Sequence, residues 1–219
     1  MHKFLLLSLL IVSAIANDVS HQYMAGVELG IDQTSYVDCT SRVTKVGIKG
    51  FQNKDKLSYN KTGPLFGIHG EYGATFNNLY YLGLNAGVSK RFYHIRGNYF
   101  YKFNQNVRYT PKETYHFCGH IGRYFDSIMG YLKGGVSLLK RKSTVSYNVP
   151  QKIERVNNGT VRGCVMGIGM RFPLTDNMCG AVELKHTRYQ KENTKFNEGL
   201  IVTQRFKSNA LSFLANYVF

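Results

Sequence analysis

Apolar residues recur at every second position along most of this chain, and this spacing limits the folds that are open to it. In the first such segment, Ala25, Val27, Leu29 and Ile31 would share one face of a strand. No window shows the 3.6-residue spacing of an amphipathic helix. Eight segments carry the alternation and are predicted to be β-strands: residues 24–31, 65–76, 80–89, 114–125, 128–142, 160–172, 178–189 and 209–219.

The connections between these segments are of two kinds. Three are short and turn-like: Asn77-Asn78-Leu79, Asp126-Ser127 and residues 174–177. Four are long, polar and basic: about 32–62, 93–113, 143–159 and 190–208. An even number of antiparallel strands with tight turns at one end and long loops at the other is typical of an outer-membrane barrel. We therefore expect an all-β fold, an eight-stranded antiparallel up-and-down transmembrane β-barrel with short periplasmic turns and long extracellular loops.

Glycine is concentrated inside the predicted strands, which hold 16 of the 22 glycines. Glycine weakens an ordinary strand because it has no side chain to pack. In a narrow eight-stranded barrel, however, some inner positions have room only for small side chains. The glycine distribution therefore favours a closed and tightly curved wall.

The N-terminus has the pattern of an export signal. A basic start at Lys3 precedes an apolar run, residues 4–16, that ends in Ala14-Ile15-Ala16. We expect residues 1–16 to be a cleaved signal peptide and residues 17–219 to form a single barrel domain. Loss of Lys3 changes the net charge from +15 to +14. The mean hydropathy of −0.25 and the lack of a later run of 18 apolar residues exclude a bundle of transmembrane helices.

The C-terminus carries the most specific signal. Leu211, Phe213, Ala215, Tyr217 and Phe219 share one face, and Phe219 is the last residue of the sequence. Here the sequence resembles the bacterial outer-membrane β-barrel superfamily, and residues 66–92 resemble its opacity-type small surface barrels. The resemblance implies an outer-membrane location, a surface antigen or adhesin, and a C-terminal signal at Tyr217 and Phe219 that the barrel-assembly machinery reads. The basic loops and the four cysteines depart from the family pattern.

If the apolar faces meet lipid, the other faces fill the barrel interior with charges of both signs. Paired and hydrogen-bonded charges can be accommodated there, whereas isolated ones are costly. We expect a plugged barrel with a structural polar network of Glu28, His69, Glu71, Lys133, Arg171, Glu183 and Lys185. Two alternatives stay open, a narrow porin-like channel and a soluble lipocalin-type barrel, because alternation alone does not distinguish inside from outside.

No motif indicates catalysis, a cofactor or a metal site. His186-Thr187-Arg188 has Arg where a lipid A deacylase would carry its serine nucleophile. Neighbouring same-face residues such as His116 and Cys118 are about 6.8 Å apart on a strand, too far for one zinc ion to collect a ligand set from that strand alone. We expect a protein that is not an enzyme. Of the four cysteines (Cys39, Cys118, Cys164 and Cys179), Cys164 and Cys179 are placed too far apart along their hairpin for a disulfide, and we expect none in the chain.

Basic residues gather in and beside the long connections, with aromatic residues between them. On a cell surface this pattern suits anionic partners such as lipopolysaccharide phosphates and host surface glycans or proteins, and the compartment argues against nucleic acid. The expected function is that of a non-enzymatic surface protein that also stiffens the envelope. The candidate anion-binding residues are Lys54, Lys56, Arg91, Arg96, Lys102, Arg108, Arg141, Lys142, Lys191 and Lys195.

Overall fold

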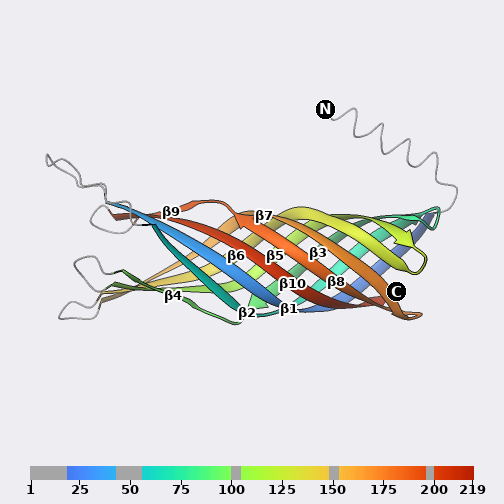
Figure 1. Ribbon diagram of the computed structural model, residues 1–219, viewed down its shortest axis with the longest axis horizontal. Coiled ribbons are helices and arrows are strands. Elements are labelled where there is room, and N and C mark those ends of the chain that lie inside the picture. The colour runs from blue at the N-terminus through green and yellow to red at the C-terminus, as the bar shows by residue number, and fades with distance from the viewer. Residues whose placement is uncertain (1–18, 43–55, 100–104, 148–152, 196–199) are drawn as a thin grey trace, which may run out of the picture.

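A computed structural model describes five stretches of the chain, residues 19–42, 56–99, 105–147, 153–195 and 200–219. They contain ten β-strands (Figure 1): β1 (Val19–Arg42), β2 (Lys56–Phe76), β3 (Tyr80–Arg91), β4 (Ile95–Tyr99), β5 (Gln105–Phe125), β6 (Ile128–Tyr147), β7 (Ile153–Thr175), β8 (Met178–Tyr189), β9 (Glu192–Lys195) and β10 (Leu200–Val218). No helix among these residues is long and apolar enough to cross a membrane.

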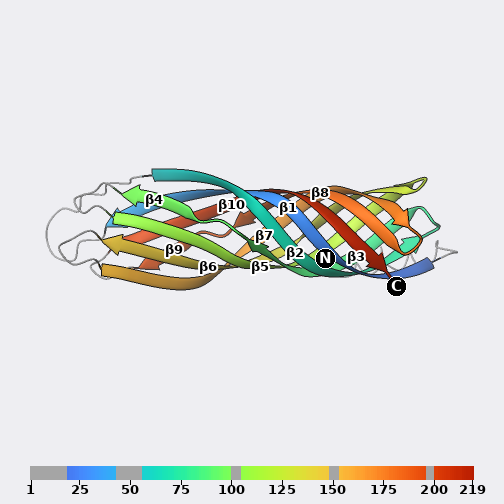
Figure 2. The ribbon, with the colours of Figure 1, turned by 90° about the horizontal axis from the view of Figure 1, so that it is seen from below.

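The strands form one closed antiparallel barrel (Figures 1 and 2). The order is β1-β2-β3-β5-β6-β7-β8-β10, and β10 returns to pair with β1. Following the paired residues once around the wall from Lys207 leads to Tyr217, ten residues further along the same strand. This stagger tilts the strands by about 35–45° to the barrel axis. The predicted eight-stranded barrel is confirmed, with β4 and β9 continuing the lines of β3 and β8.

The turns at one end agree with the prediction. Asn77 and Asn78 have φ angles of 50° and 53°, and the Leu79 N–H donates to the Phe76 carbonyl at 3.0 Å. Asp126, with φ of 55°, begins the turn between β5 and β6. Asn and Asp tolerate this left-handed conformation better than other residues with side chains. The connections at Asn77-Asn78 and Asp126 therefore place their left-handed backbone at residues that tolerate it.

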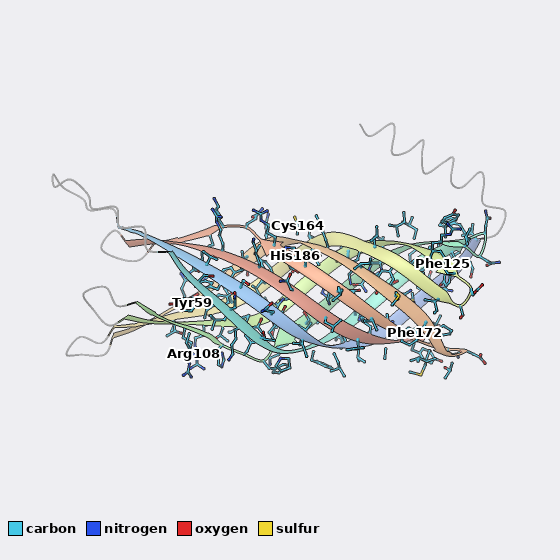
Figure 3. The ribbon with its side chains drawn as sticks, in the orientation of Figure 1. Tyr59, Arg108, Phe125, Cys164, Phe172 and His186 are labelled. Atoms are coloured by element: carbon cyan, nitrogen blue, oxygen red, sulfur yellow. The ribbon has the colours of Figure 1, made fainter. Side chains whose placement is uncertain are left out.

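The wall faces lipid on its outside, as predicted for a membrane barrel. Leu29 and Ile31 are each 59% exposed, whereas Glu28, the residue directly before Leu29, is 2% exposed. The lipocalin-type alternative, which needs the apolar face inside, is therefore wrong. Aromatic residues gather toward the turn end, where Figure 3 labels Phe125 and Phe172. Rings at that level bridge the apolar and polar parts of a bilayer.

The prediction of four long loops is wrong for much of their length. Most of these residues continue the strands: β1 runs on to Arg42, and β2 already begins at Lys56. β1 has 24 residues, about twice the 9–11 that a tilted strand needs to cross a bilayer. Apolar residues do not alternate with polar ones in this extension, because its outer side meets water instead of lipid.

Beyond the membrane the closed wall divides into two sheets (Figure 1). Pairing between β2 and β3 stops at Leu65–Arg91, and pairing between β7 and β8 stops at Gly163–Tyr189. In the described residues, β4 then pairs with β5, and β9 pairs with β10. The β4–β5 and β6–β7 hairpins form one outer sheet, and the β9–β10 and β1–β2 hairpins form the other. Two seams on opposite sides of the barrel separate them.

Several glycines on the inner face make room for tyrosine rings. A Cβ atom on Gly169 would overlap the ring of Tyr131, and one on Gly73 would overlap that of Tyr81. The same arrangement occurs at the two seams, where Tyr93 covers Gly63 and Tyr189 covers Gly163. The glycine enrichment in the strands therefore has a packing cause.

We expect Gly169→Ala to destabilise the barrel by about 1–3 kcal/mol, because its methyl group overpacks the interior against Tyr131. The temperature at which the folded gel band converts to the unfolded one should fall. Gly134→Ala is the matched control, since nothing lies within 4 Å of a Cβ at that outward position. Equal effects of the two substitutions would contradict the packing argument.

Candidate functional site

The middle of the barrel interior holds a cluster of ion pairs between strands that are not direct neighbours in the wall. Lys133 Nζ lies 3.1 Å from Glu183 Oε1, and Lys185 is paired with Glu28. The Ser212 hydroxyl donates to Glu28 at 2.5 Å, and the Tyr131 hydroxyl donates to Glu183 at 3.0 Å. Four of the interior residues singled out from the sequence therefore meet in one network.

A second cluster lies closer to the turn end and is centred on Glu71. Its carboxylate accepts a 2.7 Å bond from Arg171 Nη2 and a 2.5 Å bond from the Tyr81 hydroxyl. His120 Nδ1 lies 3.3 Å from the same oxygen. His69, also in the predicted set, is not part of this cluster; its Nε2 lies 2.6 Å from the side-chain oxygen of Asn216.

Arg91 is a third interior group, and its predicted place in an anion-binding loop is wrong. It is 7% exposed, and its Nε donates to Asp32 Oδ2 at 2.7 Å. Its other nitrogens bond Thr114, Ser208 at 3.2 Å and Tyr189 at 3.5 Å. The alternation explains the error, because β3 continues to Arg91 and turns Lys90 outward and Arg91 inward. The sequence does not identify Asp32 as the partner of Arg91, because Asp32 falls in the predicted loop of residues 32–62.

The prediction that Arg141 belongs to an anion-binding loop is also wrong. It is 1% exposed, donates through Nε to Glu192 at 2.7 Å and donates to the Ser143 hydroxyl at 2.5 Å. The strand predicted over residues 128–142 contains the run Lys140-Arg141-Lys142, and alternation along it gives Arg141 the inward direction of Lys133; the assignment of Arg141 to an anion-binding surface overlooked this phase. In the structure Lys140 points outward and Lys142 is half-buried.

An aromatic cluster joins the two outer sheets above the Arg91 layer. Phe206 on β10 stacks on Tyr109 of β5 at a centroid distance of 4.5 Å, and Tyr36 of β1 lies 4.9 Å from Phe206. Leu139 and Val161 complete the buried contact from β6 and β7. The cluster places apolar rings across the interior at the level where the wall has divided.

The interior charges balance. Besides His69 and His120, the buried charged residues of the described stretches are four acids and four Lys or Arg residues: Glu28, Asp32, Glu71, Glu183, Arg91, Lys133, Arg141 and Arg171. Lys185 and Glu192, which are partly buried, add one charge of each sign. Buried charges need partners of this kind to avoid a large desolvation cost. The excess positive charge of the chain therefore lies outside this interior set.

Much of that excess lies on the outer wall above the apolar band, and we call this set the outer cationic surface. Its exposed residues are Lys61, Lys90, Arg96, Arg108, Lys112, Lys140, Arg162, Arg188, Lys191, Arg205 and Lys207. Among the described side chains at this level, Glu113 is the single outward acid, and it lies 3.5 Å from Lys140 Nζ. Figure 3 shows Arg108 pointing away from the barrel.

His94 adds little charge to this surface at neutral pH. Partial desolvation, with Arg108 and Arg96 close by, lowers the pKa of His94 below its ordinary value. The protonated ring is therefore scarce at pH 7, and the charge of the surface comes from Lys and Arg, whose ionisation does not change near that pH.

The remaining anion-binding candidates and the C-terminal signal residues are only partly described by the structure. Lys54 and Lys102 lie outside the described residues, and the side chains of Lys56 and Lys195 are likewise not described. Arg96, Arg108 and Lys191 are exposed as expected. At the C-terminus the rings of Tyr217 and Phe219 meet edge to face at 5.0 Å, and their role as an assembly signal stays a prediction.

The described cysteines and metal-binding residue types form no site. Cys118 and Cys179 are buried, Cys164 is exposed, and all three are free thiols. No group of three His, Cys, Asp or Glu side chains in the described stretches is placed to hold a metal ion.

A closed barrel with an apolar outer band and paired interior charges is the architecture of an outer-membrane β-barrel protein. The family model described as the outer membrane protein beta-barrel domain matches residues 4–219, and the chain belongs to this family. Membership indicates a location in the outer membrane. A comparison with curated protein sequences finds no significant match.

Solved structures share this architecture at low sequence identity. The outer membrane protease OmpT from Escherichia coli is 11% identical with a TM-score of 0.52, over 93% of this chain and 99% of that one. Neisserial surface protein A is 13% identical with a TM-score of 0.41, over 87% and 97%. Ail, the attachment invasion locus protein of Yersinia pestis, was solved with the heparin analogue sucrose octasulfate; it is 13% identical with a TM-score of 0.36, over 88% and 99%. At these identities the likeness concerns the fold.

Removing the carboxylate of Glu71 should leave Arg171 buried without its partner. We expect Glu71→Gln to cost about 3–5 kcal/mol of unfolding free energy, measured by urea titration with circular dichroism in lipid vesicles. The double variant Glu71→Met, Arg171→Met removes both charges and should recover much of the loss. A double variant less stable than the single one would contradict the pairing argument.

The filled interior should prevent diffusion of ions. We expect no large, steady unit conductance when the purified protein is reconstituted in planar bilayers, because three charged layers and an aromatic cluster cross the lumen. Stable large conductance steps would instead support the narrow porin-like channel.

Proposed function

We propose that this protein is a non-enzymatic surface barrel, a surface antigen or adhesin that also stiffens the envelope, and that its outer cationic surface binds anionic glycans. Phosphates of lipopolysaccharide and sulfates of host polysaccharides share the required chemistry. The observation that carries the proposal is the imbalance on the outer wall above the apolar band, where eleven cations face one outward acid among the described side chains.

The energetics of this surface support binding. Cations near a charged surface each contribute about 1 kcal/mol of attraction, which is screened within a Debye length. The interior ion pairs leave these outer side chains out of their networks, so forming a complex breaks none of the buried contacts. Arg offers planar paired donors that match phosphate and sulfate groups, and five of the eleven cations are Arg.

A non-enzymatic role agrees with the surroundings of the histidine that sequence motifs single out. His186 lies on the outer wall, with its Nδ1 2.6 Å from the side-chain oxygen of Asn209. Its neighbour Arg188 is exposed, and Thr187 between them is buried and points to the interior. No serine stands beside this imidazole on the outer face in the positions of the deacylase motif. We also propose that residues 1–16 are removed on export and that residues 17–219 form the single mature domain.

The test is binding of heparin, as a sulfated polymer, to the full mature protein in detergent over a range of salt concentrations. Affinity should fall as salt rises. The triple variant Arg96→Gln, Arg108→Gln, Lys112→Gln should bind at least about tenfold more weakly, because three attractive charges are lost.

A charge-retaining variant, Arg96→Lys, Arg108→Lys, Lys112→Arg, serves as the control and should bind nearly as well as the parent. Heparin binding that is absent, or that does not change with salt or with the triple variant, would refute the proposed function.

A further inference from the structure

One seam of the outer wall opens into a groove. It lies where β7 and β8 cease to pair and has a volume of about 890 Å³, and the residues that line it include Arg162, Arg188, Lys191 and Arg205. The last bond before the seam opens is from the Gln190 N–H to the Arg162 carbonyl, at 2.8 Å. The groove is therefore a product of the divided wall.

The groove concentrates positive charge. Its four cations come from β7, β8, the β8–β9 connection and β10, and its lining contains no acidic residue. None of the four forms an ion pair with a carboxylate of the described residues. The nearest acid in sequence, Glu192, is bound to buried Arg141 instead. The four side chains are thus available to an anionic ligand.

The floor on the β6 side is apolar and continuous with the lipid-facing wall. Val136 and Leu138 are 56% and 40% exposed and line the groove. Cys164 of β7 lies beside Arg188 of β8 in the groove. Two residues closer to the turn end, Met166 lies beside His186, and both point outward. Figure 3 labels Cys164 and His186 close together on the outer wall at this junction.

A second hollow begins at that next pair. It has a volume of about 630 Å³, and its apolar lining includes Ile31, Met166, Ile168, Leu184 and Leu211. These side chains lie in the band that faces hydrocarbon, whereas the cations of the groove lie above it. An adjoining cationic groove and apolar hollow match a molecule with a charged head and an acyl tail.

We propose that this combined site holds one phosphorylated and acylated glycolipid of the surrounding outer leaflet. Arg162, Arg188, Lys191 and Arg205 bind its phosphates, and an acyl chain lies over the hollow beside Ile168 and Leu184. A soluble polyanion would use the cations and leave the hollow unused, so the apolar half favours the lipid. The inference rests on the proposed function, because both assume that the outer wall binds anionic glycans. It adds the location of one binding site and the class of ligand that occupies this site.

The opposite seam provides a matched comparison. There Tyr93 packs over Gly63, and the Phe92 N–H bonds the Pro64 carbonyl at 3.2 Å. Lys61, Lys90, Arg96 and Arg108 supply the same number of outward cations around β2 to β5. Replacing either set of four by Gln changes the net charge equally.

The experiment measures binding of lipid A to the full mature protein in detergent micelles. The matched variant Lys61→Gln, Lys90→Gln, Arg96→Gln, Arg108→Gln measures the general loss of affinity for lipid A when four outer cations are removed. The groove variant Arg162→Gln, Arg188→Gln, Lys191→Gln, Arg205→Gln should bind lipid A at least about tenfold more weakly than this matched variant. Heparin, which lacks an acyl chain, should lose affinity to a similar degree in both. Heat-modifiable gel mobility verifies that each variant is folded.

Two further ligands separate the sources of binding. Dephosphorylated lipid A and the deacylated phosphorylated disaccharide should each bind much more weakly than lipid A. Equal losses in the two charge variants, or a deacylated disaccharide that binds as tightly as lipid A, would overturn the lipid site. If the parent protein does not bind heparin at all, the proposed function is refuted. The two failures are therefore distinguishable.

Discussion

Backbone hydrogen bonding in hydrocarbon is the constraint on which the rest of this structure depends. A peptide group without a partner costs several kcal/mol where no water can reach it, so a membrane-crossing sheet has to close. Here the closing contact is the long pairing of β1 with β10, from Met24–Val218 to Arg42–Leu200. Closure with eight strands and a stagger of ten residues makes the interior narrow, and a narrow interior has to be filled by side chains.

The filling follows from that geometry. Large inward side chains lie over the neighbouring strand, and glycines beneath the tyrosine rings provide the space that these rings occupy. Charged groups are acceptable there because each acid is bound by a base from another strand, as in Lys133–Glu183 and Arg171–Glu71. Outside the bilayer, water can satisfy free strand edges, and the wall is able to divide. The seam that creates the cationic groove could not exist at the level of the hydrocarbon.

The sequence predicted the features that depend on alternation and turn chemistry. Leu29 and Ile31 point outward, Glu28 points inward, and Asn77-Asn78 forms a turn, all for local reasons. The extent of the strands was missed because above the membrane the two faces are both rich in polar residues, so period two is no longer visible as apolar against polar. Arg91 was assigned wrongly for the same reason, since it lies beyond the predicted strand 80–89. Arg141 lies inside the predicted strand 128–142, but its inward direction has a counter-charge only because Glu192 comes from a distant part of the chain, as Asp32 does for Arg91.

The division of the outer wall into hairpins affects how this surface can change during evolution. Each outer sheet consists of two hairpins, and in the described residues no ladder of hydrogen bonds crosses from β2 to β4 or from β7 to β9. Insertions that lengthen one hairpin therefore need no matching change in its neighbour across a seam. The outer surface is in this sense modular: its hairpins can diverge under selection while the pairing of β1 with β10 and the membrane-spanning wall stay the same.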